Sequence, residues 1–314
     1  MQSQDHFPGT EENLTTRIQT TLRRSVSRKL WKRILWRIGL VIFGFIIVGS
    51  FLLESLRYYF PQLNEMPFVI FVTVNFLLYP LIIISVRHVL ALLVDLQMAH
   101  VELLVLLGKA VAKRDQDTGE HNFRVAIMAV QLAEAAQLDS KLMMGLFMGA
   151  FLHDIGKIGV PDSILLKPNH LSHDERLEIE KHVAHGLEIV TGPEWLQGTT
   201  RVVGFHHEKF DGSGYPNQKK GAEIPIEARI FSIIDVFDAL VSIRPYKDAL
   251  PFEEALAIIV MEKGKSFDPI LLDVFMPIAK NLYNQVIQSD LEQQKEMVVK
   301  IIEKYFSQWE TEIA

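Results

Sequence analysis

Two long stretches near the N-terminus of this chain carry no charged residue. Residues 38–53 form an uncharged run of 16 residues, and residues 66–86 form one of 21 residues. Because a helix needs about 20 apolar residues to cross a bilayer, the second run fits a membrane span, and the first fits with Glu54 at the headgroups. A buried core helix is the alternative for each run, and a cleaved signal peptide is an alternative for the first. Since the second run follows so closely, we expect a two-helix transmembrane hairpin.

The charges beside these runs predict an orientation. Residues 1–37 contain eight Lys or Arg and three Asp or Glu, whereas the whole chain has a net charge of −6. Basic flanks remain on the cytoplasmic side of a membrane. We therefore expect a multi-pass protein of the inner (cytoplasmic) membrane with its catalytic domain in the cytoplasm. The acidic body argues against a nucleic acid polymer as partner.

A heptad-like pattern joins the apolar runs to the rest of the chain. Apolar residues and one histidine alternate spacings of four and three: Val89, Leu93, Leu96, His100, Leu103, Leu107 and Ala110. This pattern predicts either a coiled coil that joins two copies into a homodimer, or one helix that packs on its own domain.

The remaining sequence shows helical spacing and no sustained alternation with a period of two. We therefore predict an all-α body. The expected helices include 141–152, 175–189, 224–241 and 252–263. The predicted division of the chain is a basic segment at 1–37, the hairpin at 38–87, a linker helix at 88–104, the body at 105–285 and a C-terminal helix at 286–314.

Histidines and carboxylates at the ends of the predicted helices indicate a metal site. The chain has 11 histidines and no cysteine, so thiolate metal sites and cysteine nucleophiles are excluded. The pairs His153-Asp154 and His206-His207 each close an apolar helix, and a buried polar pair is costly unless an ion or hydrogen bonds offset the burial. With His121, His182 and Asp235 they form a donor set that suits divalent first-row metals.

Several motifs occur in the order found in one family. They are RDQDTGEH at 114–121, FLHDIGKIGVPD at 151–162, HHEKFDGSGYP at 206–216 and DVFDAL at 235–240. Together they resemble the HD-GYP phosphodiesterases over residues 105–285. The resemblance implies a five-helix HD core with added helices, acting as a metal-dependent phosphohydrolase.

The resemblance also implies roles for individual residues. His153, Asp154 and Lys157 are the expected catalytic residues, with Asp154 bridging two metals and Lys157 facing the substrate phosphate. The implied metal ligands are His121, His153, Asp154, His182, His206, His207 and Asp235. The implied substrate-binding residues are Lys157, Gly214, Tyr215, Pro216, Arg244 and Lys247; Arg244 and Lys247 could instead be surface cations, and Tyr215 could only brace its loop.

The expected activity is hydrolysis of cyclic di-GMP by a metal-activated hydroxide, with either pGpG or GMP as the final product. Iron or manganese is favoured. The alternatives are a non-catalytic cyclic di-GMP receptor and a hydrolase of another cyclic dinucleotide.

Asp117 raises the number of expected ions from two to three. Some members of the family place a carboxylate four residues before the first histidine, here His121, and hold a third metal. Residues four apart share a face if the segment is helical. The alternative is that Asp117 caps the helix that starts near Glu120.

Overall fold

The computed structural model describes residues 66–114, 120–243 and 248–313, together with scattered positions between 36 and 59. Two compact units divide the chain, the first at Met1–Ala99 and the second at His100–Ala314. Helix α2 (Met66–Arg114) contributes residues to both units.

Helix α2 contains the run at 66–86 that the sequence suggests as a second membrane span. It is a single helix of 49 residues, and its apolar character does not persist, because Arg87 and Asp95 lie further along it. Crossing a bilayer takes about 20 apolar residues in succession. Within the described residues, which include only scattered positions of the run at 38–53, no helix combines the length and the apolar character for this. The transmembrane hairpin thus finds no support, and the predicted inner-membrane location is wrong.

The second unit is helical, so the all-α prediction for the body is confirmed. Its described residues contain one isolated bridge, between Lys263 and Phe267. After α2, the longer helices of this unit are α3 (Glu120–Ala135), α4 (Met143–Leu152), α6 (His173–Glu180), α7 (His182–Val190), α9 (Ile226–Val241), α10 (Phe252–Met261), α11 (Pro269–Leu282) and α12 (Leu291–Ile313). Short helices connect them: η1 (Ser140–Leu142), η2 (Ile155–Gly159), α5 (Asp162–Leu165), η3 (Glu194–Thr199), α8 (Thr200–Val203), η4 (Gly221–Glu223) and η5 (Tyr283–Ile287).

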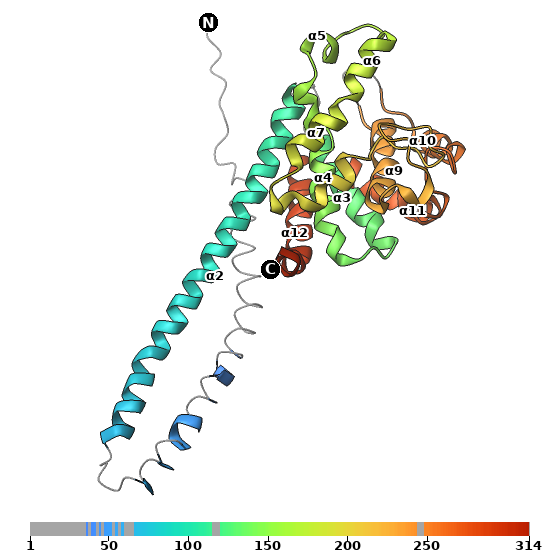
Figure 1. Ribbon diagram of the computed structural model, residues 1–314. Helices are drawn as coiled ribbons and strands as arrows, with labels where there is room; N and C mark the ends of the chain where they lie inside the picture. Colours follow the sequence, from blue (N-terminus) through green and yellow to red (C-terminus); the bar gives the residue numbers. More distant parts are fainter. Residues whose placement is uncertain are drawn as a thin grey trace, which may run out of the picture. The chain divides into compact units, whose positions relative to one another are not determined.

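Helix α4 lies at the centre of this unit. All ten of its residues, from Met143 to Leu152, are buried, so the helix has no polar face. It packs against α3, which in turn contacts α9 and α12, and Figure 1 shows α9, α10 and α11 grouped beside them. A helix apolar on every side must be surrounded by other helices, and this fixes where its C-terminal residues His153 and Asp154 lie.

The predicted helix at 175–189 is two helices. Helix α6 starts with a capping box, in which Ser172 and Glu175 satisfy each other's backbone N–H groups, and it ends at Glu180. Helix α7 begins at His182, directly after Lys181. Because of this interruption, His182 is the first residue of α7 and does not lie in the middle of a longer helix.

The part of α2 in the second unit packs on its own domain. Val101, Leu104 and Val111 are buried, whereas Leu103 and Ala110 of the proposed heptad pattern are exposed. His100, expected as a polar position of the coiled coil, stacks on Trp195 with 4.7 Å between ring centroids. The second alternative from the sequence therefore describes this part of the helix, and the homodimer stays a prediction.

The fold generates a stability prediction at Phe275 of α11. Its ring is fully buried and meets that of Phe237 at 5.2 Å, which links α11 to α9. Phe275→Ala should lower the free energy of unfolding by about 3–5 kcal/mol in urea denaturation, because it leaves a cavity in the core. The matched control is Ile270→Ala in the same helix, where the side chain is 73% exposed and the change should be within about 0.5 kcal/mol. Equal effects of the two substitutions would contradict this packing.

Candidate metal centre

Two groups of three metal-binding side chains converge in the second unit. One group contains His121 of α3, His153 at the end of α4 and Asp235 of α9. The other contains His182 of α7 with His206 and His207, which follow α8. Within each group the potential ligand atoms all lie within 4.8 Å of one another. Each group thus forms a set of three nitrogen or oxygen donors, and in the first group His121 and Asp235 are 114 positions apart in the sequence.

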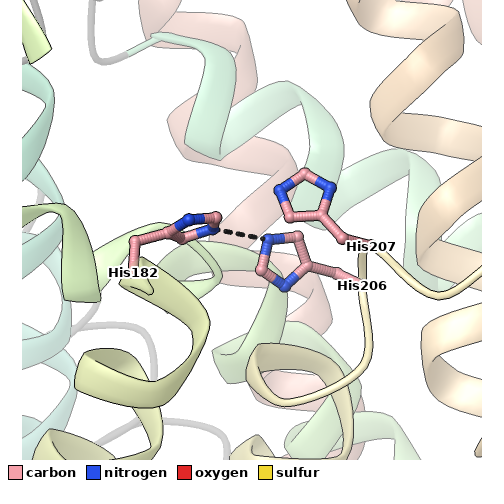
Figure 2. Close-up of side chains that lie close together, drawn as sticks. All are labelled: His182, His206 and His207. Atoms are coloured by element: carbon pink, nitrogen blue, oxygen red, sulfur yellow. Dashed lines mark hydrogen bonds between the residues drawn. The ribbon is translucent and has the colours of Figure 1, made fainter. Parts of the chain in front are cut away.

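The second group is shown in Figure 2. The three imidazoles point toward one another, and the Nε2 atoms of His182 and His206 lie 3.3 Å apart. His182 and His206 are buried, and His207 is half-buried. Three nitrogens this close leave space for an ion to contact all of them.

The buried imidazoles of three ligand histidines are oriented by their own helices. In each, Nδ1 donates to the backbone carbonyl three residues earlier, so Nε2 faces the centre and can bind a cation once it carries no proton. The bonds are 2.9 Å from His153 to Ala150, 2.7 Å from His182 to Ile179 and 3.0 Å from His206 to Val203.

Asp154 lies between the two groups. One carboxylate oxygen, Oδ2, is 3.1 Å from Nε2 of His153, and the other, Oδ1, is 3.6 Å from Nε2 of His182. Lys157 places its Nζ 2.7 Å from Oδ2. Burial alone would raise the pKa of Asp154, but the charges of Lys157 and His153 outweigh it and hold that pKa well below its usual range. The carboxylate is therefore ionised and faces both groups, as a bridging ligand must.

The donor set fits divalent metals. Burial lowers the pKa of His182 and of His206, and it lowers the pKa of His207 to about 4. These three imidazoles are consequently neutral at pH 7, the form that binds a metal. With the carboxylates of Asp154 and Asp235 they provide the nitrogen and oxygen ligands that first-row divalent ions prefer.

Comparison with known proteins agrees with this arrangement. The HD domain family matches residues 106–271, which is more than half of the chain. This chain belongs to the HD domain family. The matched region contains both groups of ligands and Asp154, so the HD domain is the part of the chain that holds the metal centre.

Three curated relatives are similar to this chain over more than half of its length. The chain is 38% identical over 192 residues to the cyclic di-GMP phosphodiesterase response regulator RpfG of Xanthomonas campestris, covering 60% of this chain and 51% of the relative. It is 40% identical over 187 residues to 3'3'-cGAMP-specific phosphodiesterase 2 of Vibrio cholerae, covering 59% and 36%. It is 38% identical over 183 residues to a cyclic di-GMP phosphodiesterase of Thermotoga maritima, covering 58% and 50%. The chain spans about half or less of the length of these three relatives, which support the resemblance to the HD-GYP family.

Two residues that were not predicted from the sequence support the HD domain's first group of ligands. Asp238 is fully buried in α9 and accepts a hydrogen bond from Nδ1 of His121 at 2.7 Å. Arg124 holds the same carboxylate with bonds of 2.6 and 3.0 Å. Burial alone would raise the pKa of Asp238, but the hydrogen bonds from His121 and Arg124 lower it, so the carboxylate is ionised. The sequence contained one indication of Asp238: it lies three residues after Asp235, so the two side chains share a face of the same helix.

Gly156 allows η2, the short helix after Asp154, to lie directly on α7. A Cβ atom at this position would be 1.8 Å from the carbonyl oxygen of His182 and 2.3 Å from the amide nitrogen of Gly186. No side chain fits there. This backbone contact brings Asp154 and Lys157 beside His182.

The loop at 207–219 closes the other side of the centre. A Cβ atom at Gly214 would be 2.3 Å from the amide nitrogen of Lys209, so only glycine fits. The buried carboxylate of Glu208, also missed from the sequence, accepts backbone bonds from Asn217 at 2.7 Å and Lys219 at 3.0 Å. Tyr215 thereby stacks on His207 with ring centroids 4.7 Å apart. Burial raises the pKa of its hydroxyl, which remains a hydrogen-bond donor.

The predicted site residues fall into two sets. The structure brings together His121, His153, Asp154, Lys157, His182, His206, His207, Tyr215 and Asp235. Gly214 and Pro216 lie in the same loop as Tyr215. Asp117, Arg244 and Lys247 lie outside the described residues.

Asp238→Asn should weaken metal binding at the first group. The amide cannot hold the imidazole of His121 as a carboxylate does, and losses of about 10–100-fold in metal affinity are typical for such partners. Titration of the metal-free protein measures the affinity. The matched control is Ser242→Ala, because Ser242 donates to the same carboxylate at 3.2 Å but contacts no ligand. Unchanged affinity in Asp238→Asn would contradict this role.

Metal binding should release about one proton from His153 at pH 7.5. Burial alone would lower the pKa of His153, but the charge and hydrogen bond of Asp154 raise it to about 9 in the metal-free protein. The imidazole must lose this proton to bind a metal, and the release should disappear as the pH rises above 9. Calorimetry in two buffers with different ionisation enthalpies counts the protons. His153→Gln should release about one proton fewer, and an equal count in both proteins would contradict the assignment.

Proposed function

We propose that this HD domain protein is a metal-dependent phosphodiesterase that hydrolyses cyclic di-GMP, with pGpG or GMP as the final product. The observation that carries the proposal is the position of Asp154, whose two oxygens face two separate groups of ligands. The printed names of relatives from Xanthomonas campestris and Thermotoga maritima support the substrate.

Each part of the centre has a role in this reaction. Bound divalent ions would supply Lewis acidity toward the phosphodiester and would lower the pKa of a bound water. Asp154 would hold the two ions together, with His121, His153 and Asp235 on one side and His182, His206 and His207 on the other. Lys157 would place its ammonium group beside a phosphoryl oxygen and stabilise the charge that develops there.

The loop at 214–216 would bind the nucleotide base. Tyr215 lies beside the centre on His207, and its ring offers a face on which guanine can stack. Arg244 and Lys247 would contact the phosphates from the chain segment after α9. The cofactors would be iron or manganese, because histidine and carboxylate ligands suit both ions. Asp117 with His121 would hold a third ion.

A second cyclic dinucleotide is favoured by one observation. A relative from Vibrio cholerae that is named as specific for 3'3'-cGAMP is 40% identical to this chain over 187 residues. Turnover of cyclic di-GMP and of 3'3'-cGAMP under the same conditions would separate the two substrates. A non-catalytic receptor fits less well, because a protein that only binds the nucleotide does not need two complete groups of metal ligands. The homodimer through α2 is likewise a proposal, supported by the exposed side chains of Leu103 and Leu106.

Asp154→Asn should abolish hydrolysis of cyclic di-GMP by the metal-loaded protein. The amide is neutral and cannot bridge two cations. Replacing a residue that only orients a metal ligand typically costs about 10–100-fold in activity, and the loss of turnover here should be larger. The measurement is the rate of pGpG formation, together with the metal content of each sample.

The matched control is His170→Ala, which removes an exposed histidine away from both groups and should leave turnover unchanged. Full activity of Asp154→Asn, or a metal-loaded wild type that hydrolyses no cyclic dinucleotide, would contradict the proposed function.

A further inference from the structure

Arg114, the last residue of α2, holds the chain segment that follows Asp154. Its guanidinium donates to the carbonyl oxygen of Lys157 at 2.6 Å and to that of Val160 at 2.5 Å. It also contacts Oδ1 of Asp162 through two nitrogens, at 2.8 and 3.1 Å. One planar group therefore fixes three positions of a six-residue segment, which a single-point cation could not do.

The segment depends on contacts from outside itself. Helix η2 has five residues, and a short 3₁₀-helix of this kind has few internal hydrogen bonds. Its amides donate from Lys157 to Asp154 and from Val160 to Lys157, at 3.0 and 3.1 Å. The carbonyl groups at its end need partners, and charge-assisted bonds from a guanidinium are among the stronger ones.

Two contacts thus fix the backbone between Asp154 and Val160. Gly156 lies on the backbone of α7, and Arg114 holds the carbonyl of Lys157. Lys157 is the residue whose Nζ reaches Asp154 at 2.7 Å. Apart from Asp154, which begins this segment, the metal ligands come from other elements, namely α3, the end of α4, α7, the turn after α8, and α9.

We infer that Arg114 is a positioning residue for the hydrolysis, acting through Lys157 rather than through the histidine ligands. The inference rests on the proposed function, because it assigns to Arg114 the placement of the ammonium group that faces the phosphate. It also makes the end of α2 part of the catalytic geometry, since the last residue of this helix fixes where Lys157 lies.

The ion pair between Arg114 and Asp162 is not a general source of stability. Asp162 is exposed and Arg114 partly so, and ion pairs in such positions contribute little to folding. Arg114→Ala should therefore keep the fold and the metal content, but reduce kcat by at least about tenfold, because a misplacement of about 1 Å near the reacting atoms is costly.

The test is a double-mutant cycle in the full-length, metal-loaded protein, with turnover of cyclic di-GMP and of bis(4-nitrophenyl) phosphate as readouts. Arg114→Ala should lower kcat in the wild type but change it less than twofold in a Lys157→Ala background, since two residues that act through one contact are not additive. Arg114→Lys should restore only part of the loss, because an ammonium group cannot reach all three acceptors. Asp162→Asn is the matched control, because it leaves both carbonyl contacts intact, and it should have a small effect.

Hydrogen exchange in the metal-free protein gives a readout that needs no substrate. Arg114→Ala should speed exchange of the amides at 155–160 by at least about tenfold and leave those of α9 unchanged. Unchanged protection at 155–160, or additive losses of kcat in the cycle, would overturn the role of Arg114. A wild type that fails on cyclic di-GMP, while the exchange effect and the cycle on bis(4-nitrophenyl) phosphate remain, would instead overturn only the proposed substrate.

Discussion

The carboxylate of Asp154 stands between two groups of histidines, and the geometry of the HD domain serves to keep it there. It is ionised beside Lys157 and within 3.6 Å of imidazoles that belong to two different groups. Because an uncompensated buried charge is strongly destabilising, such a carboxylate persists only where cations or hydrogen-bond donors face it. The helices that carry those partners must therefore meet at one point.

Backbone groups provide much of this order. Three imidazoles are oriented by carbonyl groups of their own helices, and His121 is oriented by Asp238. Each bond holds Nδ1 as the donor, so that Nε2 faces the centre. The ligands are consequently arranged before any ion binds, and binding requires little rearrangement of the side chains.

The metal ligands could be predicted from the sequence, but the residues that hold them in place could not. Histidine and aspartate pairs at the ends of apolar helices indicated the ligands, because burial of such pairs is costly without a partner. Helical spacing likewise predicted α9 to within two residues of its start. Asp238 contacts His121 and Arg124, which precede it by 117 and 114 positions in the sequence. Arg114 contacts residues that follow it by 43 to 48 positions. Spacing along one helix does not reveal contacts between such distant residues.

Two other expectations failed for different physical reasons. The predicted helix at 175–189 is interrupted at Lys181. Helix α6 buries none of its residues, so it has no buried apolar face whose end would have indicated the break. The membrane hairpin was predicted from the lack of charge in two runs. Among the described residues, however, no helix has the length and apolar character to cross a membrane.

Anomalous diffraction from crystals of the metal-loaded protein would test the central claim most directly. The account predicts an ion at His121, His153 and Asp235 and a second at His182, His206 and His207, with one oxygen of Asp154 bound to each. A single ion, or ions placed away from Asp154, would contradict it.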